Sequence, residues 1–132
     1  MGNSRYKFRA WDKVFKRMLV AGDSNLPDLT ANGCPIEPHT RKNLSMEMEL
    51  MQFTGLLDKS GKEIYEGDIC KISSCDDDGN WQKETDVTEI KYYDGCFKTT
   101  YYGFPVSSWA KNNNVHIEVI GNVHEHPELL TP

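Results

Sequence analysis

Apolar and polar residues alternate in separate segments of this chain, and this period of two limits the folds that are open to it. In RYKFRAW, residues 5–11, the cations Arg5, Lys7 and Arg9 fall on one face of an extended strand. In LSMEMEL, residues 44–50, apolar and polar residues alternate in the same way. Because successive side chains of a β-strand point to opposite faces, both segments predict half-buried strands. We therefore expect a mainly β protein with minor α structure.

Turn residues separate the predicted strands. Asp94-Gly95 lies between two runs rich in aromatic and β-branched residues, and Asp-Gly is a strong hairpin signal because the two central residues of a type I′ turn adopt positive φ. The hairpin register pairs Tyr92 with Phe97 across the strands. The same reasoning predicts an N-terminal hairpin over 5–21, a chain reversal at 58–61, a strand opened by Gly67-Asp68, a last strand at 116–123 bent at Gly121, and a helical turn begun by Pro127.

The length of 132 residues predicts a single domain, 1–132. Residues 22–43 contain three prolines and two glycines without periodicity, which indicates a long loop or an ordered excursion. The expected architecture is a small SH3-like or partly open β-barrel, or a strongly bent antiparallel sheet with long loops.

Charge and hydropathy restrict the partners and the location. A net charge of -5 argues against a protein that coats duplex nucleic acid with its whole surface. No apolar run reaches the length of a signal peptide or a membrane span, so we expect a cytoplasmic protein without a membrane partner. The four cysteines form no C-x-x-C pair, and free reduced thiols are expected in that compartment.

The first segment provides the candidate binding residues, Arg5, Lys7, Arg9 and Trp11. Six of the fifteen lysines and arginines lie in residues 5–17, on an otherwise acidic chain. Single-stranded nucleic acid is one ligand for such a face, because bases stack on Trp and phosphates pair with cations. An acidic protein is another. The structural alternative is an ordinary solvated strand face.

Two further groups of residues are candidates for metal binding or catalysis, and a structural role explains each of them better. His124 and His126 are candidate metal ligands, since alternate strand residues share a face, but Pro127 ends any strand there. Glu66 and Asp68 are candidates for a catalytic pair, although a turn-forming role suits Asp68 better. We therefore assign no catalytic residue, no metal and no cofactor.

Three segments together resemble the YopX family of bacteriophage and prophage proteins: YKFRAWD at 6–12, LMQFTGLLDKSGKEIYEGDI at 50–69 and EVIGNVHEHPELL at 118–130. The resemblance implies a small, mainly β protein made in an infected or lysogenic bacterium, hence in the host cytoplasm, and brings no catalytic or ligand-binding residue. We expect a phage or prophage accessory protein that is a non-catalytic interaction module for a host or phage protein. A single-stranded nucleic-acid-binding accessory protein is the alternative, and an enzyme is the third reading.

Overall fold

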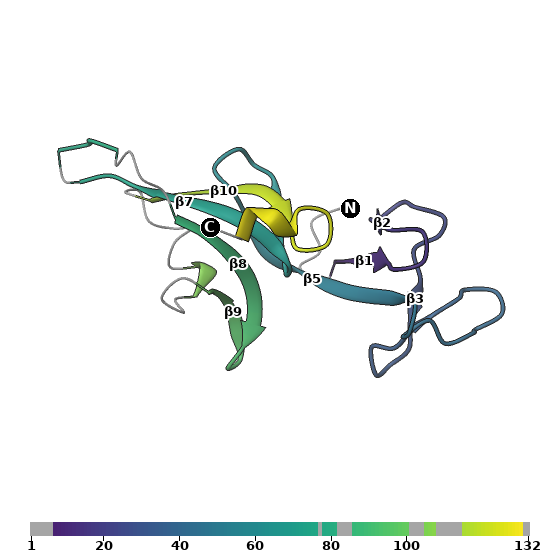
Figure 1. Cartoon of the computed structure of the whole chain (residues 1–132). Helices are drawn as coiled ribbons and strands as arrows, with labels where there is room; N and C mark the ends of the chain where they lie inside the picture. Colours follow the sequence, from purple (N-terminus) through teal and green to yellow (C-terminus); the bar gives the residue numbers. More distant parts are fainter. Residues whose placement is uncertain (1–6, 77, 82–85, 101–104, 108–114, 131–132) are drawn as a thin grey trace. The chain divides into compact units, whose positions relative to one another are not determined.

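A computed structural model of the chain describes residues 7–76, 78–81, 86–100, 105–107 and 115–130 (Figure 1). The described chain is mostly antiparallel strand with almost no helix, and one sheet is curled into a half-barrel. The predicted mainly β class with a strongly bent antiparallel sheet is therefore confirmed. The contacts divide the chain into two compact units, Met1–Phe53 and Thr54–Pro132. The single domain predicted for 1–132 remains a proposal, for which the Discussion gives a test.

The first unit is built on an N-terminal hairpin. Strand β1 (Phe8–Asp12) pairs antiparallel with β2 (Arg17–Leu19) and, on its other side, with the first half of β5 (Met48–Leu57). Ala10, Leu19 and Met51 of these strands are buried. The predicted N-terminal hairpin is confirmed.

Residues 22–43 form an ordered excursion rather than a bare loop. Two short strands, β3 (Asp28–Leu29) and β4 (Pro35–Ile36), pair antiparallel. The connection is tied by the Cys34 N–H, which donates to Thr30 Oγ1 at 3.1 Å. Ile36 is buried.

The strand predicted from Leu44 begins four residues later, at Met48. Residues 44–47 instead form a turn, in which Asn43 Oδ1 accepts the Ser45 N–H at 2.8 Å and the Leu44 carbonyl accepts the Met48 N–H at 2.9 Å. The prediction of strand over 44–47 was wrong because the side chain of Asn43 offers the backbone a local turn, which competes with strand pairing.

The second unit contains the larger sheet. Strands β10 (Val115–Asn122), β7 (Asp68–Ser74), β8 (Asp86–Tyr93) and β9 (Cys96–Thr99) lie side by side in that order, all antiparallel. Figure 1 shows the strong curvature of β8. The end of β5 and strand β6 (Glu63–Tyr65) form a hairpin within the same unit. Its buried core is Ile64, Cys70, Ile72, Ile90, Val106 and Ile117.

The predicted turns of this unit are confirmed. Gly67 has a φ of 86° and precedes β7, and the buried carboxylate of Asp68 accepts the Tyr65 N–H at 2.7 Å. The register of β10 shifts between Val119 and Gly121, as expected for a strand bent at this glycine. The helical turn predicted at Pro127 is the 3₁₀ segment η1 (Pro127–Leu130). No helix among the described residues has the length and apolarity needed to cross a membrane.

Candidate functional site

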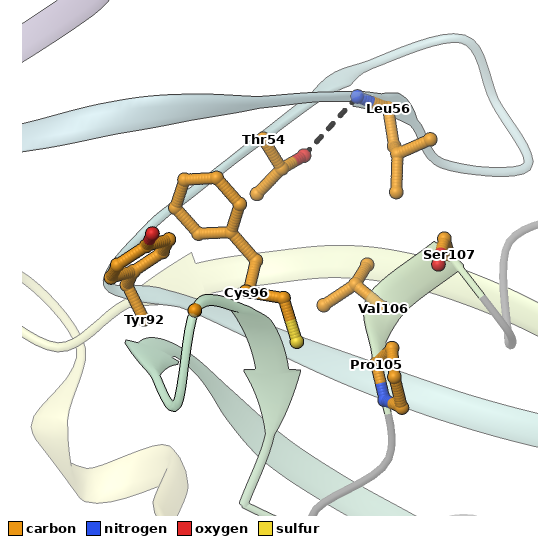
Figure 2. A pocket seen from close by; sticks show the side chains of 9 residues that line it. Thr54, Leu56, Tyr92, Cys96, Pro105, Val106 and Ser107 are labelled. Atoms are coloured by element: carbon orange, nitrogen blue, oxygen red, sulfur yellow. Dashed lines mark hydrogen bonds between the residues drawn. The ribbon is translucent and has the colours of Figure 1, made fainter.

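The second unit contains an apolar pocket of about 290 Å³. Three pieces of chain supply its walls: the end of β5, the β8–β9 hairpin and residues 105–107. Figure 2 shows the side chains of these pieces around one space. The lining residues are Thr54, Leu56, Tyr92, Gly95, Cys96, Phe97, Pro105, Val106 and Ser107.

The β5 wall is apolar although it includes a threonine. Thr54 and Leu56 both line the pocket from β5, on either side of Gly55, whose φ is 86°. The Thr54 hydroxyl donates to the Ile64 carbonyl at 2.7 Å. It also accepts the Leu56 N–H at 3.2 Å, which Figure 2 shows as a dashed line. These bonds use the hydroxyl proton and one of its two lone pairs, so this wall mainly offers hydrocarbon to a ligand.

The β8–β9 hairpin supplies the aromatic wall. Tyr92 and Phe97 are cross-strand partners, as predicted from the Asp94-Gly95 turn, and their rings meet edge to face with centroids 5.0 Å apart. Asp94 and Gly95 both have positive φ, 52° and 85°, as a type I′ turn requires. Phe97 packs against the core, whereas Tyr92 is 53% exposed at the rim. The hairpin therefore exposes the ring of Tyr92, whose position is restrained by its contact with Phe97.

Residues 105–107 join the pocket to the core. Val106 is fully buried and belongs to the core cluster, and Pro105 makes a β-bridge with Lys98 of β9. Cys96 is half-buried and lines the pocket together with Val106. A pocket of this size and lining can receive an apolar side chain by excluding water from hydrocarbon.

Three carboxylates outside the pocket have lowered pKa values. Burial by itself would raise the pKa of Asp12, but hydrogen bonds from the N–H groups of Phe15 and Val14 and from Arg17 lower it overall. The N–H of Thr40 is the main cause of the lowered pKa of Glu37. In the same way, the Asn80 N–H is the main cause of the lowered pKa of Asp76. All three carboxylates accept N–H groups of their own turns, which is a structural role.

The structure places the predicted binding residues in unlike environments. Arg5 lies outside the described residues. Lys7 Nζ lies 5.4 Å from the centre of the Phe53 ring, Arg9 is buried at 8% exposure, and Trp11 is half-buried. A binding role for this face stays a prediction.

The predicted metal candidates lie near η1. His126 Nδ1 accepts the Asn122 N–H at 3.3 Å, and the His124 N–H donates to Asn122 Oδ1 at 3.0 Å. Within the described ranges, no group of three or more His, Cys, Asp or Glu side chains is arranged to hold a metal ion. Glu66 and Asp68 flank the turn before β7, where Asp68 binds a backbone N–H.

Residues 7–131 match the family model described as YopX protein. A curated relative, the SPbeta prophage-derived uncharacterized protein YopX of Bacillus subtilis (strain 168), is 37% identical over 76 residues, which are 53% of this chain and 52% of that protein. The chain thus matches about half the length of this relative.

Two crystal structures share the fold over nearly the whole chain. Protein EF1440 from Enterococcus faecalis is 31% identical with a TM-score of 0.64, covering 94% of this chain and 96% of its own. Protein YopX from Bacillus subtilis is 28% identical with a TM-score of 0.65, covering 98% of both chains.

Proposed function

The chain belongs to the YopX family, and from this we propose that it serves a bacteriophage or prophage as a non-catalytic module that binds another protein in the host cytoplasm. The apolar pocket is the observation that carries this proposal. Its volume of about 290 Å³ lies at the lower end of pockets that bind small molecules, which span about 300–1,000 Å³. One or two apolar side chains of a protein partner match that space and its hydrocarbon walls.

The rim supports a protein partner. Tyrosine is enriched among the residues that dominate protein–protein binding energy, because it buries a large apolar area and keeps a polar tip. Tyr92 is exposed and is held against Phe97. The neighbouring Tyr93 ring is covered on one face by Lys98 Nζ at 4.8 Å, and the same ammonium lies 3.8 Å from Asp94. A hairpin ordered in this way loses little conformational entropy on binding.

The experiment is affinity purification of the full tagged chain from phage-infected cells, with and without nuclease. We compare wild type with Tyr92→Ala and use Leu57→Ala as the matched control. Leu57 is equally exposed, at 53%, and is not among the residues that line the pocket. A protein partner should survive nuclease, be retained by Leu57→Ala, and be bound roughly tenfold or more weakly by Tyr92→Ala.

Cys96 provides a second readout at the pocket itself. Cys70 is fully buried, so replacing Cys34 and Cys75 by serine leaves one accessible thiol among the four cysteines. The captured partner should slow the reaction of Cys96 with a thiol reagent. If Tyr92→Ala captures the partner as well as wild type does and Cys96 labelling is unchanged, the partner does not bind at the pocket. Loss of every partner after nuclease treatment would favour the nucleic-acid alternative.

A further inference from the structure

The tip of the N-terminal hairpin, residues 13–17, exposes apolar and basic side chains together. All five residues, Lys13, Val14, Phe15, Lys16 and Arg17, are exposed, with Val14 at 63% and Phe15 at 71%. Exposed single hydrophobic residues are common on proteins, whereas contiguous apolar surface rimmed by polar residues is typical of interaction sites. At the tip two adjacent exposed apolar residues, Val14 and Phe15, are flanked by the cations Lys13 and Lys16.

A third exposed apolar residue, Met46, belongs to the adjoining turn. The Lys13 N–H donates to the Glu47 carbonyl at 2.8 Å, which holds turn 44–47 against the tip. Met46, next to Glu47 in the chain, is 82% exposed. The flexible thioether side chain of methionine adapts to varied apolar partners.

The tip is ordered before any partner binds. The buried carboxylate of Asp12 accepts the N–H groups of Val14 and Phe15 at 2.9 and 3.1 Å and bonds Arg17 Nε at 3.2 Å. The guanidinium of Arg17 also covers the Phe15 ring, 4.9 Å from its centre. Both contacts restrain Phe15, so binding at the tip costs less ordering entropy.

The remaining charge of the tip is positive. Asp12 and Arg17 neutralise each other, whereas Lys13 and Lys16 have no ion-pair partner among the residues that the structure describes. The half-buried Glu47 is the neighbouring acid. On a chain of net charge -5, this small cationic group attracts negative partners locally.

We propose that the hairpin tip, with Phe15 and Val14 as apolar anchors and Lys13 and Lys16 as flanking cations, docks an acidic amphipathic segment of a partner protein. Such a segment supplies carboxylates for the two lysines and apolar side chains for Phe15, Val14 and Met46. A nucleic-acid strand can stack a base on Phe15 but leaves Val14 and Met46 without a matching apolar surface, and an anionic bilayer would repel the rest of the acidic chain. This inference rests on the proposed protein-binding function but uses a different surface from the pocket.

The test measures fluorescence anisotropy of a labelled synthetic helical peptide with leucines on one face and glutamates on the other. The full-length wild type should bind this peptide and not its lysine-substituted counterpart. Phe15→Ser and the double variant Lys13→Glu/Lys16→Glu should each weaken binding by roughly tenfold. Val20→Ser and Lys42→Glu, at exposed positions outside residues 13–17 and outside turn 44–47, should bind as wild type does.

Circular dichroism and thermal melting establish that each variant is folded. Failure of the wild type to bind the acidic peptide would overturn the proposal, as would equal binding by the tip variants. Preference for an oligothymidylate strand or for phosphatidylserine-containing vesicles over the peptide would overturn it too. Tyr92→Ala should bind the peptide as wild type does. Peptide binding therefore tests the tip alone, whereas partner capture by Tyr92→Ala tests the pocket, and the two proposals can fail separately.

Discussion

Gly121 of β10 lies directly against the ring of His126. A Cβ added at this glycine would stand 2.7 Å from His126 Nδ1 and 2.9 Å from Leu129 Cδ1, closer than carbon and nitrogen approach without repulsion. The absence of a side chain at Gly121 therefore lets the chain turn at Asn122 and fold η1 back onto the strand.

Gly121→Ala should destabilise the protein by roughly 1–3 kcal/mol, because the added methyl overpacks a closed contact. Urea unfolding followed by circular dichroism measures the change. In a His126→Ala background the same substitution should cost less, since the imidazole that it strikes is gone. An equal cost in both backgrounds would contradict the steric explanation.

Asp58→Ala should cost roughly 2–4 kcal/mol, because the buried carboxylate accepts the N–H groups of Ser60, Lys62 and Val119 at 2.8, 2.9 and 2.9 Å. Asp58→Asn keeps one acceptor oxygen, so its free energy of unfolding should lie between those of wild type and Asp58→Ala. Asp23→Ala, which removes an exposed acceptor of the Val20 N–H, is the matched control and should cost under about 1 kcal/mol. Chemical denaturation separates these values, and similar losses for Asp58→Ala and Asp23→Ala would argue against a special role of Asp58.

The contribution of Asp12 should depend on pH. Its folded-state pKa lies below the ordinary value of 3.8 because the hydrogen bonds of the tip outweigh burial. The stabilisation is therefore present above that ordinary value and is lost as pH falls through the folded-state pKa. Thermal melting of wild type and Asp12→Asn at neutral pH and through about pH 5 to 2 should show a gap that narrows in acid. A constant gap would contradict this linkage.

Gly95→Val should destabilise the protein by about 1 kcal/mol or more. Space is not the reason, because nothing lies within 4 Å of an added Cβ. The φ of 85° is costly for a β-branched residue. Gly95→Asn is the control, since asparagine tolerates positive φ, and thermal melting should rank glycine above asparagine above valine. Equal melting of the two variants would be inconsistent with a backbone cause.

The two units should unfold together as one domain. Strand β5 pairs with β1 over 48–52 and continues into the hairpin with β6, so melting one unit removes half of a strand that the other uses. Calorimetry of the full chain should give one transition whose calorimetric and van't Hoff enthalpies agree. Two separate transitions would contradict the single-domain proposal and indicate two independently folding units.

Local signals were sufficient for much of the fold. The Asp94-Gly95 turn predicts both its hairpin and the pairing of Tyr92 with Phe97, because a two-residue turn fixes the register. Alternation is weaker information, because it separates the two faces of a strand without indicating whether other parts of the chain cover one face or both. Arg9 and Ala10 lie on opposite faces of β1 and both are buried.

The pocket was beyond sequence reasoning because its walls depend on tertiary contacts. Leu56, Phe97 and Val106 come from three distant segments, and each one alone reads as an ordinary core residue. The sequence predicted part of the hairpin tip, because Lys13, Lys16 and Arg17 belong to the basic segment 5–17. Alternation did not show that, among the described residues of this segment, the exposed cations are Lys13, Lys16 and Arg17 of the tip, whereas Lys7 is half-buried and Arg9 is buried.

The bond between Asp58 and Val119 also sets an order of events during synthesis. The two residues are 61 positions apart, and at about 5–20 residues per second a ribosome needs roughly 3–12 s to add the second after the first. Throughout that interval the carboxylate of Asp58 has only the N–H groups of its own turn to bind. The contact between the β5–β6 turn and β10 therefore forms only after β10 has been translated, and a nascent chain halted before Val119 lacks it.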